Sequence, residues 1–409
     1  MTIRLSDDEK AMLAGEMGEP RRLAMEQQVA VGAFFDAPDM VRVTQAHLMA
    51  DGEAVGGAGV EMLERLCKAP AEQRRVMVPT VTDPRGVDPK ACSWLKQPEH
   101  APERERRIVE AFRAMGILLT DTCIPYQVVA PPVLGEHVAF GDTGSTIYAN
   151  SVLGARSNFE GGVAALWAGL TGRVPRYGFH LDERRRGTVA FEVDFRPGDY
   201  AEWGALGAVV GRKMGSYWDV PVVFGIDPPP TSDELKHFGA ALASWGSTPM
   251  FHMAEVTPEA ASAFDGPVPA AHRLRREDLA ELLARLNRPG PVDVVVFAAP
   301  QLSLLELQVL AGLLDGRRVR TPLLAAVPPA VAADAERQGL AEIFRAAGAK
   351  ILEGVCFYQM YAREIGEAMG WKRLATSSAK LANIIQGYGY EPALLSTEAC
   401  VEAAVRGRI

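Results

Sequence analysis

The stretch VDVVVFAAPQLSLLELQVLAGLLDGRRVRTPLLAAV, residues 292–327, decides the fold class. Residues 292–298 form an apolar, β-branched run that is typical of a buried strand, and a turn with Pro300 follows it. A helix is expected over residues 304–314 and a second buried strand over residues 321–327. A buried strand, a helix and another buried strand in succession predict parallel strands that are covered by helices.

The same alternation of strands and helices extends to most of the chain. Further strands are expected at residues 75–81, 117–119, 221–225 and 350–352, and helices over residues 103–115 and within 154–172. The segment 1–66 is expected to be mostly helical around a short strand near residues 40–46, and Ser6 with Glu9 forms a capping-box pattern. The sequence therefore predicts an α/β protein with mainly parallel sheets around a central cleft.

A proline break at residues 228–230 is a candidate boundary between two lobes. The first lobe, residues 1–225, would hold Cys123 and the YANSVLGAR loop at residues 148–156. The second lobe, residues 226–409, would hold Cys356, the TSSAK segment at residues 376–380, and Cys400.

Composition excludes several classes of function. The chain of 409 residues is 48% hydrophobic and 23% charged, which is an ordinary globular balance. Its net charge of −8 disfavours general binding of nucleic acid, because phosphate contacts dominate that affinity. The acidic start lacks the apolar core of a secretion signal, and no apolar window is long enough to span a membrane, so we expect a cytoplasmic protein.

The cysteines are candidates for metal chemistry. The five are an odd number and widely scattered, so they are better explained as free thiols or metal ligands than as disulfides. Cys123 and Cys356 both follow predicted strands, as does the turn at residues 300–303, and such strand ends form ligand sites in parallel sheets. A small buried hydrophobe is the alternative interpretation of Cys123. Because no Cys-x-x-Cys is present, an iron–sulfur cluster would need thiolates from distant segments.

Two polar segments are candidates for substrate binding. In YANSVLGARSNFEGG (residues 148–162), Ser151, Arg156 and Asn158 offer a hydroxyl, a guanidinium and an amide, and an Arg binds a carboxylate with two hydrogen bonds. In TSSAK, Ser377, Ser378 and Lys380 are suited to an anion site. Helix capping by the polar side chains explains both segments equally simply. His47 and His252 lie in apolar surroundings, which favours histidines with satisfied hydrogen bonds in the core.

Taken together, these segments resemble the large subunit of the aconitase X family. The resemblance is carried by long motifs along the whole chain: LSDDEKAMLAGEMGEPRRLAME (5–26), AHLMADG (46–52), GILLTDTCIPY (116–126), YANSVLGARSNFEGG (148–162), LTGRVPRYGFHLDERRRGTV (170–189), WGALGAVVGRKMG (203–215), LKHFGAALASWGSTPMFHMAEVTPEA (235–260), TSSAKLAN (376–383) and EACVEAAVRGRI (398–409).

The resemblance implies aconitase-like α/β/α domains around an iron–sulfur cluster, either [2Fe-2S] or [4Fe-4S], with Cys123, Cys356 and Cys400 as its ligands. Lys380 and Arg156 are the implied catalytic cations, and Ser151, Asn158, Ser377, Ser378 and His252 the implied substrate-binding residues. Members occur as fused or split proteins. Because this chain ends at Ile409, it resembles the split type and is expected to need a small swivelling subunit that carries the serine base.

The implied activity is that of a hydro-lyase acting on a small hydroxy-acid, in which the cluster iron acts as a Lewis acid. Dehydration of cis-3-hydroxy-L-proline is favoured by the composition rich in Ala, Arg and Gly, which suggests a bacterium. Dehydration of mevalonate 5-phosphate is favoured by the NFEGG motif at residues 158–162. A non-catalytic binding or scaffold subunit is the alternative of another class.

The chain departs from the family pattern at expected pocket positions. Members often have Gly-Thr-Pro-His or Gly-Cys-Pro-His where this chain has Ala298-Ala299-Pro300-Gln301. Thr-Asn-Ser-Ala-Lys is replaced by TSSAK, and Thr-Leu-Asn-Pro by residues 80–84, TVTDP. These differences bear most on the identity of the substrate.

Overall fold

The apolar run that begins at residue 292 forms β10 (Val294–Phe297), the central strand of a five-stranded parallel sheet in the computed structural model, which describes residues 3–409. All four β10 residues are buried, because helices cover both faces of the sheet. The other strands of this third region are β11 (Leu323–Val327), β12 (Lys350–Glu353), β13 (Arg373–Thr376) and β14 (Glu391–Leu394). Its helices are α12 (Leu304–Leu314), α13 (Pro329–Arg337), α14 (Leu340–Ala347), α15 (Ala362–Met369), α16 (Ala379–Ile384) and α17 (Thr397–Arg406).

The strand order of this sheet is β12-β11-β10-β13-β14. From β10 the chain adds β11 and then β12 on one side, and it returns to add β13 and β14 on the other side of β10. The order of strands therefore reverses between the neighbours β10 and β13. In open parallel sheets, ligands bind at the carboxyl ends of the two strands where the order reverses. The turn after β10 and the TSSAK segment after β13 lie at this position.

The first region holds a second, smaller parallel sheet of order β3-β2-β4, formed by β2 (Ala46–Leu48), β3 (Thr80–Thr82) and β4 (Ala139–Phe140). The strands β1 (Met40–Arg42) and β5 (Arg173–Pro175) pair antiparallel beside it. Its helices are α1 (Asp7–Ala14), α2 (Glu19–Phe34), α3 (Gly52–Cys67), α4 (Ala71–Arg74), α5 (Ala101–Ala114), α6 (Pro125–Val128), α7 (Thr143–Ser151) and α8 (Ala164–Thr171). The Ser6–Glu9 capping box opens α1 as expected.

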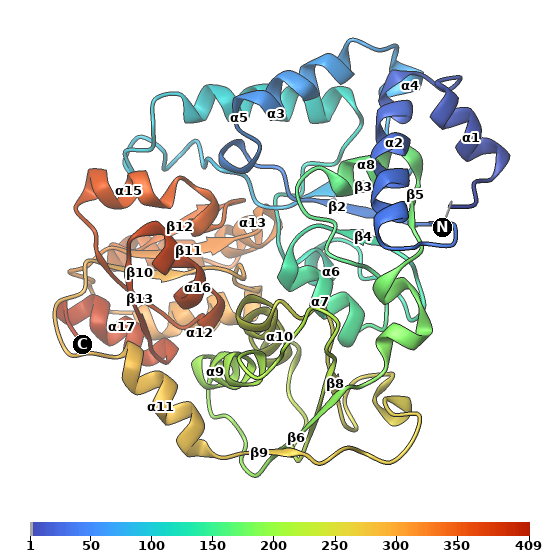
Figure 1. Ribbon diagram of the computed structural model, residues 1–409. Coiled ribbons are helices and arrows are strands. Elements are labelled where there is room, and N and C mark those ends of the chain that lie inside the picture. The colour runs from blue at the N-terminus through green and yellow to red at the C-terminus, as the bar shows by residue number, and fades with distance from the viewer. Residues whose placement is uncertain (1–2) are drawn as a thin grey trace.

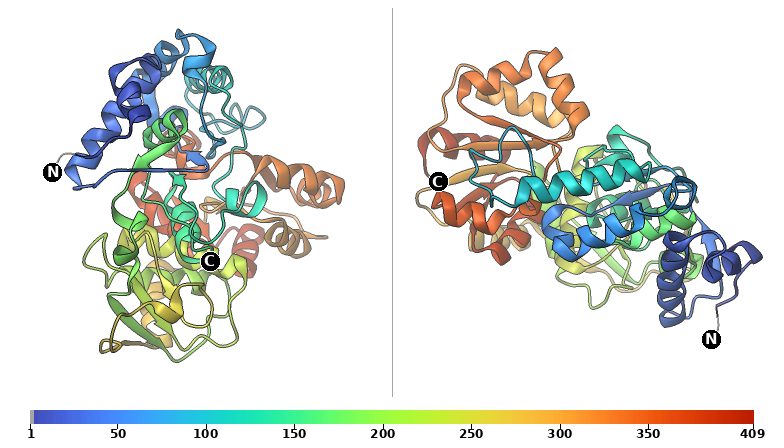
Figure 2. Two further views of the ribbon diagram at one scale, coloured as in Figure 1. Left: turned by 90° about the vertical axis from the view of Figure 1, so that its right-hand side faces the viewer. Right: turned by 90° about the horizontal axis from the view of Figure 1, so that it is seen from above.

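The second region is built on the parallel sheet β8-β7-β6-β9, with β6 (Val189–Val193), β7 (Pro221–Phe224), β8 (His252–Met253) and β9 (His272–Leu274). Its helices are α9 (Tyr200–Gly211), α10 (Ser232–Gly246) and α11 (Arg276–Leu286). In Figure 1 the third region is the orange and red part, the second is green to yellow below, and the first extends along the top and right. Viewed from above in Figure 2, the two termini lie at opposite ends.

Several elements differ in extent from the sequence predictions. The strand expected at residues 75–81 is confined to β3, and the one expected at 117–119 contributes only a bridge between Leu118 and Val81. The helix expected within residues 154–172 is the short α8. The sheet of the second region joins β6 and β7 to β8 and β9, so it crosses the lobe boundary expected at residue 225. Residues 1 and 2, which the predicted first lobe includes, lie outside the described residues.

The strand β12 lies at the edge of the five-stranded sheet, and a loop of the first region covers part of this edge. Asp88 Oδ2 accepts a hydrogen bond from the backbone N–H of Glu353 at 3.0 Å, and Arg85 forms a parallel bridge with Val355. Within residues 3–409, none of the helices combines the length and apolar character needed to cross a bilayer.

Candidate active site

Two of the predicted cysteines meet where the first and third regions join. Cys123 follows the segment that bridges to β3, and Cys356 follows β12, so each stands beyond the carboxyl end of a parallel strand. Both side chains are buried. Burial raises the pKa of the Cys123 thiol well above its usual range, and the adjacent Cys356 raises it further. The structure therefore brings these two predicted cysteines together at one position.

Gln301, in the turn after β10, contacts both cysteine-bearing segments. Its backbone N–H points to Cys123 Sγ at 3.2 Å, and its side-chain Oε1 accepts from the Cys123 N–H at 3.2 Å. Its Nε2 donates to the carbonyl oxygens of Asp121 and Val355 at 3.2 and 3.1 Å. This fully buried residue therefore links the turn after β10 to the main chain beside both cysteines.

A buried ion pair lies beside the thiols. Lys380 Nζ is 2.8 Å from Asp142 Oδ1, and Asp142 Oδ2 accepts from the backbone N–H of Ser145 at the start of α7. Burial alone would raise the pKa of Asp142, but the charge and hydrogen bond of Lys380 hold it below its usual value. Burial would likewise lower the pKa of Lys380, and Asp142 raises it instead. Both groups are therefore charged at neutral pH.

The pKa of a second carboxyl, Asp83, is shifted in the direction opposite to that of Asp142. Burial raises its pKa well above the usual value, and repulsion by Asp142 and Cys123 adds to this, although Gln359 Nε2 donates to Asp83 Oδ2 at 2.9 Å. Asp83 Oδ1 has no hydrogen-bond partner among residues 3–409 and lies 3.4 Å from His47 Nε2. The surroundings of Asp83 therefore favour its protonated form, and its Oδ1 makes no hydrogen bond within residues 3–409.

His47, on β2, lies near both carboxyls: its Nε2 is 3.4 Å from Asp83 Oδ1, and the charge of Asp142 acts on its pKa. Its Nε2 donates to the Thr122 carbonyl at 2.7 Å, and its Nδ1 lies 3.1 Å from Ser145 Oγ. Burial lowers the pKa of His47 to about 4, so the ring is neutral. The expectation of a core histidine with satisfied hydrogen bonds agrees with these contacts, but the residue stands inside the candidate site.

The carboxyl ends of two parallel sheets thus meet at one buried cluster. Environments that push the pKa values of two carboxyls apart are typical of sites that use one as a proton donor and keep the other charged. Asp83 has the properties of the donor, and the Asp142–Lys380 pair those of the fixed charges. Structural ion pairs also shift pKa values, so the assignment depends on the location of the cluster at the strand ends as well.

Ser377 and Ser378 follow β13 and are buried at the same edge of the sheet. Ser378 is the N-cap of α16 and accepts from the Leu381 N–H at 3.0 Å, and its hydroxyl donates to the Ala299 carbonyl at 2.6 Å. It thereby joins the turns after β10 and β13. Capping, the simple interpretation of TSSAK, holds for Ser378, while Lys380 in the next turn reaches Asp142.

The remaining predicted substrate-binding residues, and Arg156, which was predicted to be catalytic, make their contacts elsewhere in the structure. Ser151 Oγ accepts from the Phe251 N–H, and His252 Nε2 donates to the Arg185 carbonyl. Asn158 bonds the Tyr177 carbonyl and the Phe179 N–H, while Arg156 pairs with Asp182. The structure therefore does not bring these four residues to the thiol and carboxyl cluster.

Cys400 is likewise separate from the thiol pair. It lies on α17 in the apolar core beneath the five-stranded sheet, where its Sγ is 3.8 Å from the Leu395 carbonyl. Charged groups that affect its thiol are Asp199 and Glu398, not the groups around Cys123. Within the described chain, no three His, Cys, Asp or Glu side chains are grouped so as to hold a metal ion. The three predicted cysteines therefore do not fit as ligands of one cluster.

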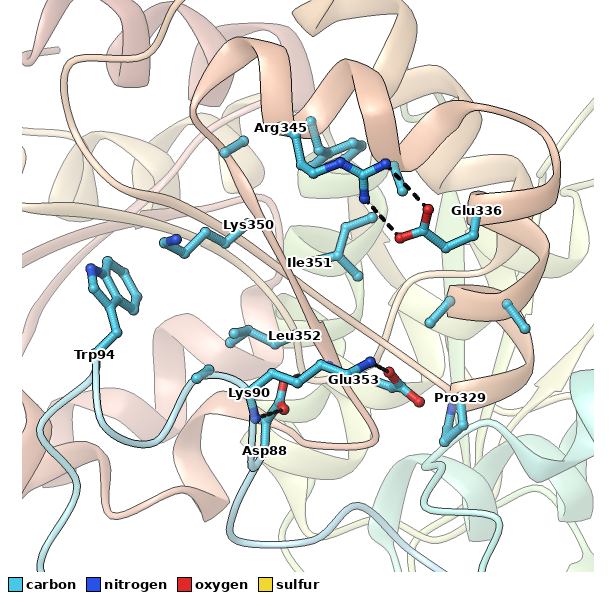
Figure 3. A pocket seen from close by; sticks show the side chains of 16 residues that line it. Asp88, Lys90, Trp94, Pro329, Glu336, Arg345, Lys350, Ile351, Leu352 and Glu353 are labelled. Atoms are coloured by element: carbon cyan, nitrogen blue, oxygen red, sulfur yellow. Dashed lines mark hydrogen bonds and ion pairs between the residues drawn. The ribbon is translucent and has the colours of Figure 1, made fainter.

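A cavity of about 470 Å³ lies away from this cluster, between the first region and the outer helices of the third (Figure 3). Its charged side chains neutralise one another: Lys90 pairs with Glu353 and Arg345 with Glu336, while Lys350 lies over the Trp94 ring. Such a lining offers few free polar groups for a substrate. The thiol and carboxyl cluster is therefore the better candidate site.

The sequence did not indicate Asp142, and it indicated Asp83 and Gln301 only as members of segments at expected pocket positions. All three lie within four residues of the end of a strand, where ligands bind in parallel sheets. However, β3 and β4 have only three and two residues, which is too short for a periodic signal. Asp142 is followed by Thr143 and Gly144, which is also the pattern of an ordinary helix cap.

Comparison with known proteins agrees with this architecture. Family models of the aconitase X first, second and third domains match residues 2–183, 187–284 and 292–406. The phosphomevalonate dehydratase large subunit of Methanothermobacter thermautotrophicus is 33% identical over 94% of this chain and 94% of its own length. The cis-3-hydroxy-L-proline dehydratase of Pseudomonas aeruginosa is 35% identical over 99% of this chain and 70% of its own.

A solved structure of Thermococcus kodakaraensis aconitase X in its holo-form superposes with a TM-score of 0.88 at 30% identity. The match covers 98% of this chain and all of that one. The order of domains, the sheets and the sequence motifs thus agree along nearly the full length. This chain belongs to the aconitase X family.

Proposed function

We propose that this chain is the large subunit of a hydro-lyase that removes water from a small hydroxy-acid. The observation that carries the proposal is a buried pair of carboxyls beside two thiols at strand ends. Burial raises the pKa of Asp83, whereas the contact with Lys380 lowers that of Asp142. Relatives that share the family and nearly the full length of the chain are named as dehydratases.

Dehydration requires loss of a proton from carbon and departure of a hydroxyl, which is a poor leaving group. Asp83, whose raised pKa favours the protonated form, is suited to protonate the departing oxygen, because its Oδ1 makes no hydrogen bond within the described chain. Lys380 supplies a fixed positive charge for the carboxylate of the substrate and for charge that develops on it. The base that removes the carbon-bound proton is expected on the small subunit.

An iron–sulfur cluster, expected from the resemblance, would supply a Lewis acid for the departing hydroxyl. Cys123 and Cys356 are adjacent, but Cys400 is packed in another core, so the expected set of three cysteines does not fit. The roles proposed for Asp83 and Lys380 do not depend on an iron–sulfur cluster.

We propose cis-3-hydroxy-L-proline as the first substrate candidate and mevalonate 5-phosphate as the second. Lys380 is the cation that contacts the carboxyl Asp142, which already neutralises it. A small zwitterion with one carboxylate matches this charge better than a phosphorylated acid, which carries two anionic groups. The second candidate is supported by the relatives named phosphomevalonate dehydratase large subunit, whose lengths agree with that of this chain.

We propose that the partner is a small subunit and that the complex is cytoplasmic. The match covers 70% of the Pseudomonas aeruginosa relative, so roughly a third of that longer chain has no counterpart here. A separate chain equivalent to this part would complete the site.

The test is a dehydration assay of the purified complex with its small subunit on both substrates. We expect turnover of cis-3-hydroxy-L-proline, and a loss of about 100-fold or more in kcat for Asp83→Asn, which preserves the shape of the side chain but cannot donate an acidic proton. Asp182→Asn, at an exposed ion pair, is the matched control and should retain turnover.

Full activity of Asp83→Asn would refute the proton-donor role. Turnover of mevalonate 5-phosphate alone would exchange the order of the two substrates. If an intact complex turns over neither substrate, the chain acts as a scaffold subunit and the proposed activity is wrong.

A further inference from the structure

We infer that Gln301 is the positioning residue that holds Cys123 and Cys356 together across the junction of the three regions. The inference rests on the proposed function, because it concerns how the same site is assembled. It does not depend on which substrate is used.

The position of Gln301 relative to the three regions is the first argument. Cys123 and Asp121 belong to the first region, between α5 and α6, whereas Val355 and Cys356 belong to the third, after β12. The Gln301 side chain bonds the Cys123 N–H and the Asp121 carbonyl on one side and the Val355 carbonyl on the other. One amide therefore fixes the main chain beside each thiol in both regions.

The second region supplies an anchor for the same residue. Lys236 Nζ, on α10, donates to the Gln301 carbonyl at 3.4 Å and lies 3.0 Å from Asp233 Oδ1, with Glu306 as a further partner. Burial would lower the pKa of Lys236, but Glu306 and Asp233 raise it, so the ammonium stays charged. The main chain of Gln301 is thus held by a buried charge network.

Burial of the Cys123 and Cys356 thiols means that the Gln301 hydrogen bonds control access to them. Cys123 is 4% and Cys356 1% exposed, so a reagent reaches them only after the structure opens. The two cysteines come from the first and third regions, so separation of these regions would expose both. Such a movement must break the bonds from Gln301 to Cys123 and Asp121, while the bond to Val355 stays within the third region. Gln301 therefore sets both the closed geometry of the thiols and the free energy needed to open the junction.

Thiol labelling tests this directly. The full chain, treated with a chelator and a reductant so that its thiols are free, is exposed to iodoacetamide under native conditions, and each cysteine is followed by mass spectrometry. We expect Gln301→Met, which keeps the length of the side chain but removes its donors and acceptor, to label Cys123 and Cys356 about tenfold faster or more.

Cys400 is the internal control. It is fully buried within the core of the third region, so it becomes reactive only when that region itself unfolds. Its labelling rate should therefore stay unchanged in Gln301→Met. A matched variant is Gln28→Met, because Gln28 is also a buried amide that bonds a backbone carbonyl, that of Arg173, but within the first region. It should not accelerate Cys123 and Cys356 selectively.

Equal acceleration of all three cysteines would show a general loss of stability and would overturn the inference. Unchanged rates at Cys123 and Cys356 would overturn it as well. Because labelling requires no turnover, this result is independent of the dehydration assay. If the complex is inactive but Gln301→Met labels Cys123 and Cys356 selectively, the positioning role of Gln301 stands and only the proposed activity is wrong. If the complex is active but labelling is not selective, only the positioning role is wrong.

Discussion

The strand-end cluster around Asp83 and Asp142 and the loop at residues 148–162 are both rich in polar side chains, yet they differ in how these are used. In the loop, Ser151 and Asn158 bond backbone groups, and Arg156 pairs with Asp182 at the surface. In the cluster, the pKa values of two neighbouring carboxyls are shifted in opposite directions, beside a buried lysine and two thiols. A buried oxygen without a hydrogen-bond partner in the described chain occurs in both regions, at Asp83 and at Glu160. Polar density alone therefore does not identify a site, whereas a grouping of charged and protonatable side chains at strand ends does.

The largest effect is expected when the buried ion pair of the cluster is broken. Lys380→Met leaves Asp142 as an unpaired buried charge, so we expect a loss of about 3–5 kcal/mol in the free energy of unfolding, together with loss of turnover. Denaturant unfolding and the dehydration assay measure the two effects.

The double variant Lys380→Met/Asp142→Asn is the control for that experiment. Because it removes both charges, it should recover much of the stability and remain inactive. Recovery of activity along with stability would mean that the pair only supports the fold.

Glu160, at the end of the loop, is expected to give an effect of intermediate size that depends on pH. Burial raises the pKa of Glu160 from 4.5 to about 7, so the folded state favours the neutral acid. Its contribution to stability is fully present below pH 4.5 and is lost as the pH rises through about 7. Glu160→Gln, which is neutral throughout, should therefore gain on the order of 2–3 kcal/mol relative to the parent across this range.

Unfolding curves of both proteins, measured at pH 4.5 and above pH 7, test this expectation. A difference between the two proteins that does not change with pH would show that Glu160 finds a partner for its charge. In that case it would be equivalent to the other polar residues of the loop.

The smallest effect is expected at Arg156. Its partner Asp182 has a side chain 76% exposed, and ion pairs of this kind contribute at most about 1 kcal/mol. Arg156→Ala should therefore change the unfolding midpoint little and leave KM and kcat unaltered. A tenfold or larger rise in KM would instead support the substrate contact that the sequence suggested, and the difference between loop and cluster would disappear.

The sequence predicted the fold well where the signals are long. The expected helix at residues 304–314 coincides with α12, because an apolar run follows the capping box of Ser303 and Glu306. The thiol pair was also predicted, since both cysteines follow strands. Asp142 was not, and Asp83 and Gln301 were indicated only as members of expected pocket segments. Their individual roles arise from contacts between residues as far apart as Gln359 and Asp83, and no local pattern records such contacts.

Asp88 has a consequence for how the molecule behaves among its own copies. By accepting the N–H of Glu353, its carboxylate occupies a position that a neighbouring strand would otherwise pair with on β12, and the charged Lys90 stands beside it. Exposed edge strands are templates for intermolecular sheet growth, and inserted charges prevent this. The carboxylate of Asp88, from another part of the chain, thus blocks one pairing position at the β12 edge of the largest sheet.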